Sequence, residues 1–144
     1  MRWGQRAVIA AAATVMAFSG LTGCSSPTRC LPQPLTASAT VVERGSTVKV
    51  SSPKASCDLG YKAGHTYAIT IASEGSQSSG KPTPGPQTTP ATVTVNVDGS
   101  FATTVPVPVN FPIGPAFIVV TGSRLDRCED TGSCAGYAIG ISVK

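Results

Sequence analysis

The chain has 144 residues, the length of a single domain. Its 11 Lys and Arg residues exceed its seven Asp and Glu residues and give a net charge of +4 at pH 7. Arg2 and Arg6 belong to an amino-terminal segment that is typical of export signals, so nine cations and seven acids remain in residues 24–144. No basic block interleaved with aromatic residues remains, and we therefore expect no nucleic-acid partner.

The amino-terminal segment has the layout of a secretory signal. Arg2 and Arg6 precede an apolar run over residues 7–18, which is followed by the small and polar residues 19–23. This run is shorter than the ~20 apolar residues that a stable membrane-spanning helix needs. The segment is therefore expected to be removed after export.

A cysteine stands where the signal ends. Residues 21–24, Leu-Thr-Gly-Cys, resemble the lipobox of bacterial lipoproteins. The resemblance implies that a diacylglycerol is attached to the sulfur of Cys24 and that the signal is cut before this residue. The predicted parts are a signal peptide at 1–23, a lipidated tether at 24–34 and a domain at 35–144, held on the extracytoplasmic face of the cell membrane. The alternative is an ordinary cleaved signal with an incidental cysteine.

Four further cysteines point to disulfides. An exported chain meets an oxidising environment, and an even number of cysteines remains after Cys24. Three connectivities are possible, and we favour Cys30 with Cys57 and Cys128 with Cys134. The four cysteines show neither redox nor zinc spacing, so the sequence indicates structural disulfides and no metal site.

The hydrophobic pattern has a period of two residues, which is typical of β-strands with one buried face. Such alternation covers four segments: Val48 and Val50; Tyr67, Ile69 and Ile71; Val93, Val95 and Val97; and Tyr137, Ile139, Ile141 and Val143. Strands with one apolar face must be packed face to face in two sheets. The sequence therefore predicts an all-β, two-sheet sandwich of about seven strands.

Turn and proline signals refine this arrangement. Residues 98–100, Asp-Gly-Ser, predict a β-hairpin between the strands on either side. Pro106 and Pro108 place the returning strand at a sheet edge, because proline cannot donate to a ladder. Residues 117–121 are apolar on both faces and predict a central strand.

Two segments are irregular in composition. Residues 73–90 consist mostly of Ser, Gly, Pro, Thr, Lys and Gln, and they predict a long exposed loop that is either functional or merely flexible. Residues 52–64 are also irregular, but Cys57 is expected to order them.

Several phrases resemble a family. Residues 42–50, 63–69, 98–101 and 112–117 resemble the repeated punctuation of immunoglobulin-like domains in surface proteins of actinobacteria. The carboxy-terminal pair Cys128 and Cys134, leading into a last strand, is similar to the neocarzinostatin-like sandwich. The resemblance covers about residues 35–144 and implies an immunoglobulin-like fold. It supplies no catalytic residue.

Candidate chemical groups are few. His65 lies beside a glycine and is expected to be exposed in a turn. Asp126, Glu129 and Asp130 form an acidic cluster without the ligand spacing of a calcium loop, and we expect a solvated acidic tip. No nucleophile elbow, phosphate-binding loop or dinucleotide fingerprint is present. The sequence therefore indicates no catalytic residue and no cofactor.

These observations favour a non-enzymatic, membrane-anchored interaction module of the cell envelope. Its membrane partner is reached through the lipid, and its other partner is expected to be an envelope protein or a wall polymer. The alternative is a carrier that holds a small apolar ligand within or at one end of the sandwich. An enzyme is the third possibility, with His65 and Asp130 as its first candidate residues.

Overall fold

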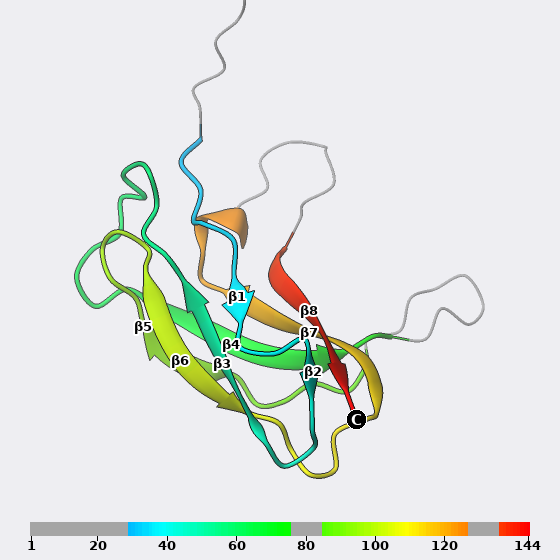
Figure 1. The fold of residues 1–144 in the computed structure, drawn as a ribbon. Helices are drawn as coiled ribbons and strands as arrows, with labels where there is room; N and C mark the ends of the chain where they lie inside the picture. Colours follow the sequence, from blue (N-terminus) through cyan, green and yellow to red (C-terminus); the bar gives the residue numbers. More distant parts are fainter. Residues whose placement is uncertain (1–28, 76–84, 127–135) are drawn as a thin grey trace, which may run out of the picture.

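The computed structural model describes residues 29–75, 85–126 and 136–144. Within these ranges the chain is almost entirely β-structure, and its strands form two sheets that are packed against each other (Figure 1). The predicted two-sheet, all-β sandwich is therefore confirmed.

The described ranges contain eight strands and one short 3-10 helix. The strands are β1 (Thr36–Ala37), β2 (Val41–Val42), β3 (Thr47–Ser52), β4 (Thr66–Ser73), β5 (Ala91–Thr94), β6 (Phe101–Pro106), β7 (Gly114–Thr121) and β8 (Tyr137–Val143), and the 3-10 helix is Arg124–Asp126. One sheet has the order β1-β3-β6, and the other has the order β2-β8-β7-β4-β5.

The first segment of the fold joins both sheets. β1 pairs antiparallel with β3, and β2 pairs parallel with β8 after only a short connection. The amide of Ser142 donates to the carbonyl of Thr40 and begins the parallel pairing.

The core lies between the two sheets and is built from the alternating positions of the sequence. Val48 and Val50 of β3 are completely buried, as is Ile71 of β4. Burying one such side chain contributes about 1.5–3 kcal/mol before entropy is counted. The cluster comprises Leu35, Val42, Val48, Val50, Tyr67, Ile69, Ile71, Val95, Phe101, Val105, Val107, Phe111, Ala116, Ile118, Val120, Tyr137, Ile141 and Val143.

The hairpin predicted at residues 98–100 is wrong, although the turn itself is present. β5 belongs to the five-stranded sheet and β6 to the three-stranded sheet, so the turn passes from one sheet to the other. The carboxylate of Asp98 accepts from the amide and the hydroxyl of Ser100, at 3.0 and 2.7 Å, and these bonds lower the pKa of Asp98. Val95 and Val97 both lie beyond the end of β5, but Val95 is 2% exposed and Val97 is 54% exposed, so the predicted alternation stops at Val95. A turn signal fixes a local reversal but not the sheet that the next strand joins.

The described part of the long loop predicted at residues 73–90 includes residues 85–90, which are exposed or half-buried and lie outside the strands, but it makes one pairing that the sequence did not predict. Gln87 forms a β-bridge with Ala72 of β4. The amide of Thr88 donates to the carbonyl of Ile71, and the Ile71 amide donates to the Thr88 hydroxyl, both at 2.9 Å. A polar composition did not reveal this pairing because the bonds use the backbone and one short hydroxyl.

Two other predictions about the strands are confirmed. β6 lies at the edge of its sheet and ends at Pro106, whose missing N–H would interrupt a further ladder. β7 lies between β8 and β4, so both of its sides are paired. The segment that is apolar on both faces is therefore central.

The two ends of the sandwich differ. The segment from residue 29 to β1, the β3–β4 connection and the 3-10 helix lie at the upper end in Figure 1, and the carboxy-terminal residue Lys144 lies at the opposite end. Cys30 is bonded to Cys57, as predicted, and this disulfide joins the incoming chain to the β3–β4 connection. Cys24, Cys128 and Cys134 lie outside the described residues. In the described part of the chain, no helix has the length and apolar character to cross a membrane.

Candidate functional site

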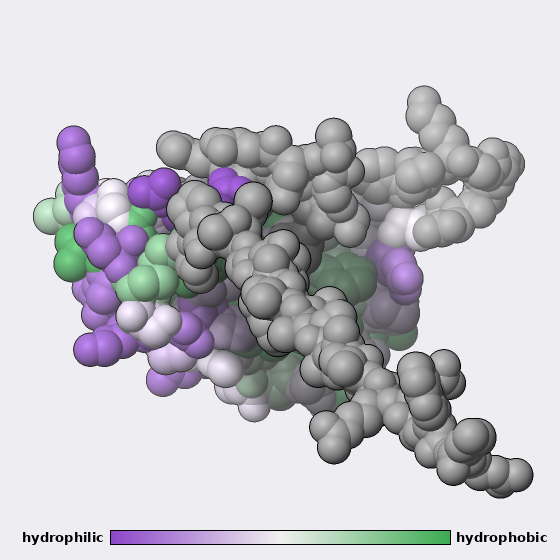
Figure 2. Space-filling model, turned by 90° about the horizontal axis from the view of Figure 1, so that it is seen from above, coloured by the Kyte–Doolittle hydropathy of each residue, from purple (hydrophilic) through white to green (hydrophobic). Residues whose placement is uncertain are grey.

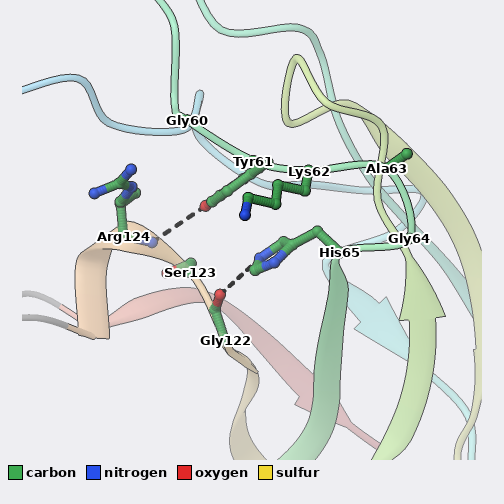
Figure 3. Close-up of a pocket in the computed structure, with 9 residues that line it drawn as sticks. All are labelled: Gly60, Tyr61, Lys62, Ala63, Gly64, His65, Gly122, Ser123 and Arg124. Atoms are coloured by element: carbon green, nitrogen blue, oxygen red, sulfur yellow. Dashed lines mark hydrogen bonds between the residues drawn. The ribbon is translucent and has the colours of Figure 1, made fainter.

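A pocket of about 400 Å³ lies at the upper end of the sandwich. Residues 60–65 of the β3–β4 connection form one wall, and residues 122–124, which follow β7, form the other (Figure 3). Seen from above, hydrophilic residues gather on the left of this end (Figure 2). The volume falls in the range of small-molecule sites, which is about 300–1,000 Å³.

A glycine turn shapes the first wall. The carboxylate of Asp58 accepts from the Gly60 amide at 2.7 Å, and Gly60 has a φ of +66°. The Nε of Arg124 donates to the carbonyl of Leu59 at 2.7 Å. A Cβ atom on Gly60 would lie 2.6 Å from a terminal guanidinium nitrogen of Arg124. Glycine is therefore needed here both for its backbone conformation and for the close passage of Arg124.

Asp126 shapes the second wall. Its carboxylate accepts from the amides of Gly122 and Ser123, and the Ser123 hydroxyl accepts from the Leu125 amide. Asp126 is exposed, as expected of a solvated acid, and its carboxylate has in addition a capping role at the start of the 3-10 helix, which the sequence reasoning did not predict. Glu129 and Asp130, the other predicted acids, lie outside the described residues. The two reciprocal bonds, from the Ser123 amide to Asp126 and from the Leu125 amide to the Ser123 hydroxyl, are typical of the capped start of a helix.

His65 is not the exposed turn residue that the sequence predicted. It follows a turn, but its side chain is only partly exposed, and its Nε2 lies 2.9 Å from the carbonyl oxygen of Gly122. Its ring stacks on Tyr61 with centroids 4.0 Å apart, and it meets the edge of Tyr67 at 5.5 Å. Because a carbonyl can only accept, the Nε2–H of His65 is the donor in this bond. His65 therefore links the two walls.

The phenol groups form a chain under the pocket. The buried hydroxyl of Tyr67 donates to the hydroxyl of Tyr61 at 2.9 Å. The same Tyr61 oxygen accepts from the Arg124 amide at 3.2 Å. Burial, aided by the bond to Tyr61, raises the pKa of Tyr67 above its ordinary value. The hydroxyl of Tyr137 donates to the carbonyl of Gln33 at 2.7 Å, and burial raises its pKa as well.

The charged side chains of the pocket are cations. Lys62 and Arg124 are among the nine described residues that line it, and none of the nine is a carboxylate. Figure 3 shows the amino group of Lys62 directed toward residues 122–124. A hollow at the opposite end differs, because its Lys144 and Glu43 form an ion pair at 3.7 Å.

The chemistry available in the pocket is binding through hydrogen-bond donors. His65 bonds to a backbone carbonyl, which is neither a nucleophile that it could activate nor a carboxylate that could orient it. Among the described residues, no group of three or more His, Cys, Asp and Glu side chains could hold a metal ion. The donors and cations match a ligand that is rich in acceptors.

The sequence identified only part of this site. It singled out His65 and Cys57, which lie in the same connection, and Asp126 beside the second wall. It missed Tyr61 and Arg124, which are 63 residues apart and meet only in the folded chain. A local signal was available at residues 123–126, Ser-Arg-Leu-Asp, which has the spacing of a helix-capping box.

Comparisons with known proteins assign no family. No family model matches the sequence, and no curated protein matches it. Among solved structures, the fold is similar to the Pseudomonas fluorescens alkylpurine DNA glycosylase AlkC bound to DNA containing an abasic site analog, with a TM-score of 0.39 and 9% sequence identity. The alignment covers 81% of this chain and 30% of that chain. A likeness of this size carries no functional argument, so the chemistry of the pocket must supply one.

Proposed function

We propose that this chain is a lipid-anchored, non-enzymatic binding module on the extracytoplasmic face of a cell membrane. The disulfide between Cys30 and Cys57 supports export, because such bonds persist in oxidising compartments. The lipobox-like residues 21–24 support anchoring through Cys24. The resemblance to actinobacterial surface proteins belongs to the same proposal.

The observation that carries the binding role is the pocket at the end of the sandwich. Its walls come from two connections, as in many binding domains that present loops on a rigid β-scaffold. Lys62 and Arg124 supply charge, and Tyr61 and His65 supply a fixed aromatic surface. We propose that an envelope component, either a protein or a wall polymer, is recognised at this end.

The described pocket does not favour the apolar carrier. A carrier of that kind would need a concave site lined by apolar side chains with few polar groups. Here the lining includes Lys62, His65, Ser123 and Arg124, and the inner faces of the sheets are filled by the core cluster. We therefore keep the polar interaction module as the proposal.

Position-specific photocrosslinking in native membranes tests the binding role. A photoreactive amino acid would replace Ala63, which is exposed at the pocket rim, and the matched control would replace Ile113, which is 65% exposed elsewhere. Mass spectrometry should find an envelope component enriched with position 63 over position 113. Equal capture at both positions would contradict recognition through this pocket.

Membrane fractionation tests the anchor separately. Replacing Cys24 with Ala removes the only atom to which the proposed lipid could be attached. The variant should move from the membrane fraction to the soluble fraction, because two acyl chains give far stronger attachment than a folded polar domain. Retention of Cys24→Ala in the membrane would refute lipid anchoring.

A further inference from the structure

The pocket presents several donors that have no acceptor among the described residues. The hydroxyl oxygen of Tyr61 accepts bonds from Tyr67 and from the Arg124 amide, which leaves its own hydrogen available. Arg124 donates through Nε to Leu59, and its two terminal amino groups have no described acceptor. The ammonium group of Lys62 makes neither a hydrogen bond nor an ion pair within the described ranges.

Two of these donor side chains, those of Tyr61 and Arg124, are held in place before any ligand binds. The guanidinium of Arg124 is fixed by its bond to Leu59 and by the close passage over Gly60. The Tyr61 ring is fixed by stacking on His65, which is itself bonded to Gly122. A ligand that binds to fixed donors loses less of its binding free energy to side-chain ordering.

The acids next to the pocket do not compete for a ligand. Asp58 accepts from the Gly60 amide, and Asp126 accepts from the amides of Gly122 and Ser123. Neither carboxylate lines the pocket. The pocket therefore offers two cations and a phenol hydrogen to an incoming group, and the carbonyls of Lys62 and Gly122 in its lining are already bonded to His65.

We propose that this pocket binds an oxyanionic group of the phosphate class through Tyr61, Lys62 and Arg124. Guanidinium and ammonium groups form short, charge-assisted hydrogen bonds with phosphate oxygens, and the phenol adds a neutral donor. The site deepens the proposed function and rests on it for its setting in the cell envelope. Two sources carry this chemistry there, a phospholipid head group and a soluble or polymer-borne phosphate.

Calorimetric titration with inorganic phosphate tests the site directly. The full lipidated chain in non-ionic detergent would be titrated with sodium phosphate and, as a blank, with sodium chloride at equal ionic strength. Lys62→Gln should weaken binding about tenfold, the value of one charge-assisted hydrogen bond. Lys49→Gln, an equal charge change at an exposed position of β3, should bind as the wild type does. Equal affinities for the two variants would overturn the proposal.

Lysine acetylation in vesicles distinguishes the sources. The lipidated protein would be reconstituted in phosphatidylcholine vesicles with and without phosphatidylglycerol, and the acetylation of Lys62 and Lys49 would be compared by mass spectrometry. Protection of Lys62 by phosphatidylglycerol assigns the site to a lipid head group. Calorimetric binding of phosphate without that protection assigns it to a soluble or polymer-borne phosphate. Absence of both effects would overturn the proposal.

The two proposals fail separately. Retention of Cys24→Ala in the membrane would refute the anchor and would leave the phosphate titration of the purified chain unchanged. Loss of phosphate binding with normal fractionation would refute the oxyanion site alone. The ammonium group of Lys62 makes no bond within the described ranges, and Lys62→Gln keeps the backbone carbonyl that accepts from the His65 amide, so the melting temperature should be unchanged.

Discussion

Replacing Tyr61 with Phe should destabilise the fold through a neighbouring residue. The substitution keeps the ring that stacks on His65 and removes only the oxygen that accepts the Tyr67 hydroxyl. Tyr67 is 1% exposed, so water does not reach the abandoned hydroxyl in the native packing. Leaving a buried donor without a partner costs about 1–3 kcal/mol.

The size of this loss in stability depends on which groups lose a hydrogen-bond partner. The amide of Arg124 also loses its bond to Tyr61, but Arg124 is only partly buried, so water can replace that bond. The unpaired Tyr67 hydroxyl therefore dominates the loss. For a domain of this size, roughly 4 °C of melting temperature should be lost for each kcal/mol.

Urea unfolding followed by circular dichroism would measure the loss in the free energy of unfolding, provided that its dependence on urea concentration is the same in the variant and the wild type. The double variant Tyr61→Phe with Tyr67→Phe is the decisive control, because removing both polar partners is close to neutral. It should recover most of the stability that Tyr61→Phe loses. A single variant within about 0.5 kcal/mol of the wild type, which is the error of such comparisons, would refute the reasoning. A double variant less stable than the single variant would refute it as well.

Three further results are expected. Replacing Cys30 and Cys57 together with Ala should lower the free energy of unfolding by about 3.6 kcal/mol on the chain-entropy model, since they are separated by 27 positions; an unchanged urea midpoint would contradict this. Gly122→Ala should lose about 1–3 kcal/mol in the same assay, because φ is positive and a Cβ would approach a strand carbonyl; Gly64→Ala, with positive φ but open space, should lose less. Burial raises the pKa of Tyr67, so near pH 10 the phenol ionises only in the unfolded chain, and the free energy of unfolding should be constant below about pH 10 and fall above it. Tyr67→Phe should reduce this alkaline fall, as measured by urea unfolding at several pH values. An equal fall in the variant and the wild type would contradict the raised pKa of Tyr67.

The strands were predictable because a strand that buries one face has apolar residues at every second position. Val48 and Val50 alternate with polar residues and are fully buried on one side of β3. The pairing of strands was less predictable, because the same period serves either sheet. Residues 98–100 illustrate this limit: their turn chemistry is local, whereas the choice of sheet for β6 depends on its partner β3.

The candidate site was less predictable than the fold because its contacts join distant parts of the chain. Gly60 and Gly122 each have positive φ, and each lets another segment pass at close range. The sequence shows a glycine but not the atom that lies against it. The alternating pattern likewise predicts that Tyr67 is buried, but it does not predict which group accepts its hydroxyl hydrogen. That acceptor, the hydroxyl of Tyr61, depends on how the β3–β4 connection folds back.

The position of the disulfide connects the proposed anchor with the pocket. From Cys24 to the first strand at Thr36 there are 12 residues, which can span at most about 40 Å. The bond between Cys30 and Cys57 shortens this free length to six residues, or about 20 Å. Cys57 belongs to the connection that also supplies Tyr61 and Lys62. Under the proposed lipidation, the disulfide therefore keeps the pocket end of the sandwich close to the membrane, where phosphate-bearing head groups are concentrated.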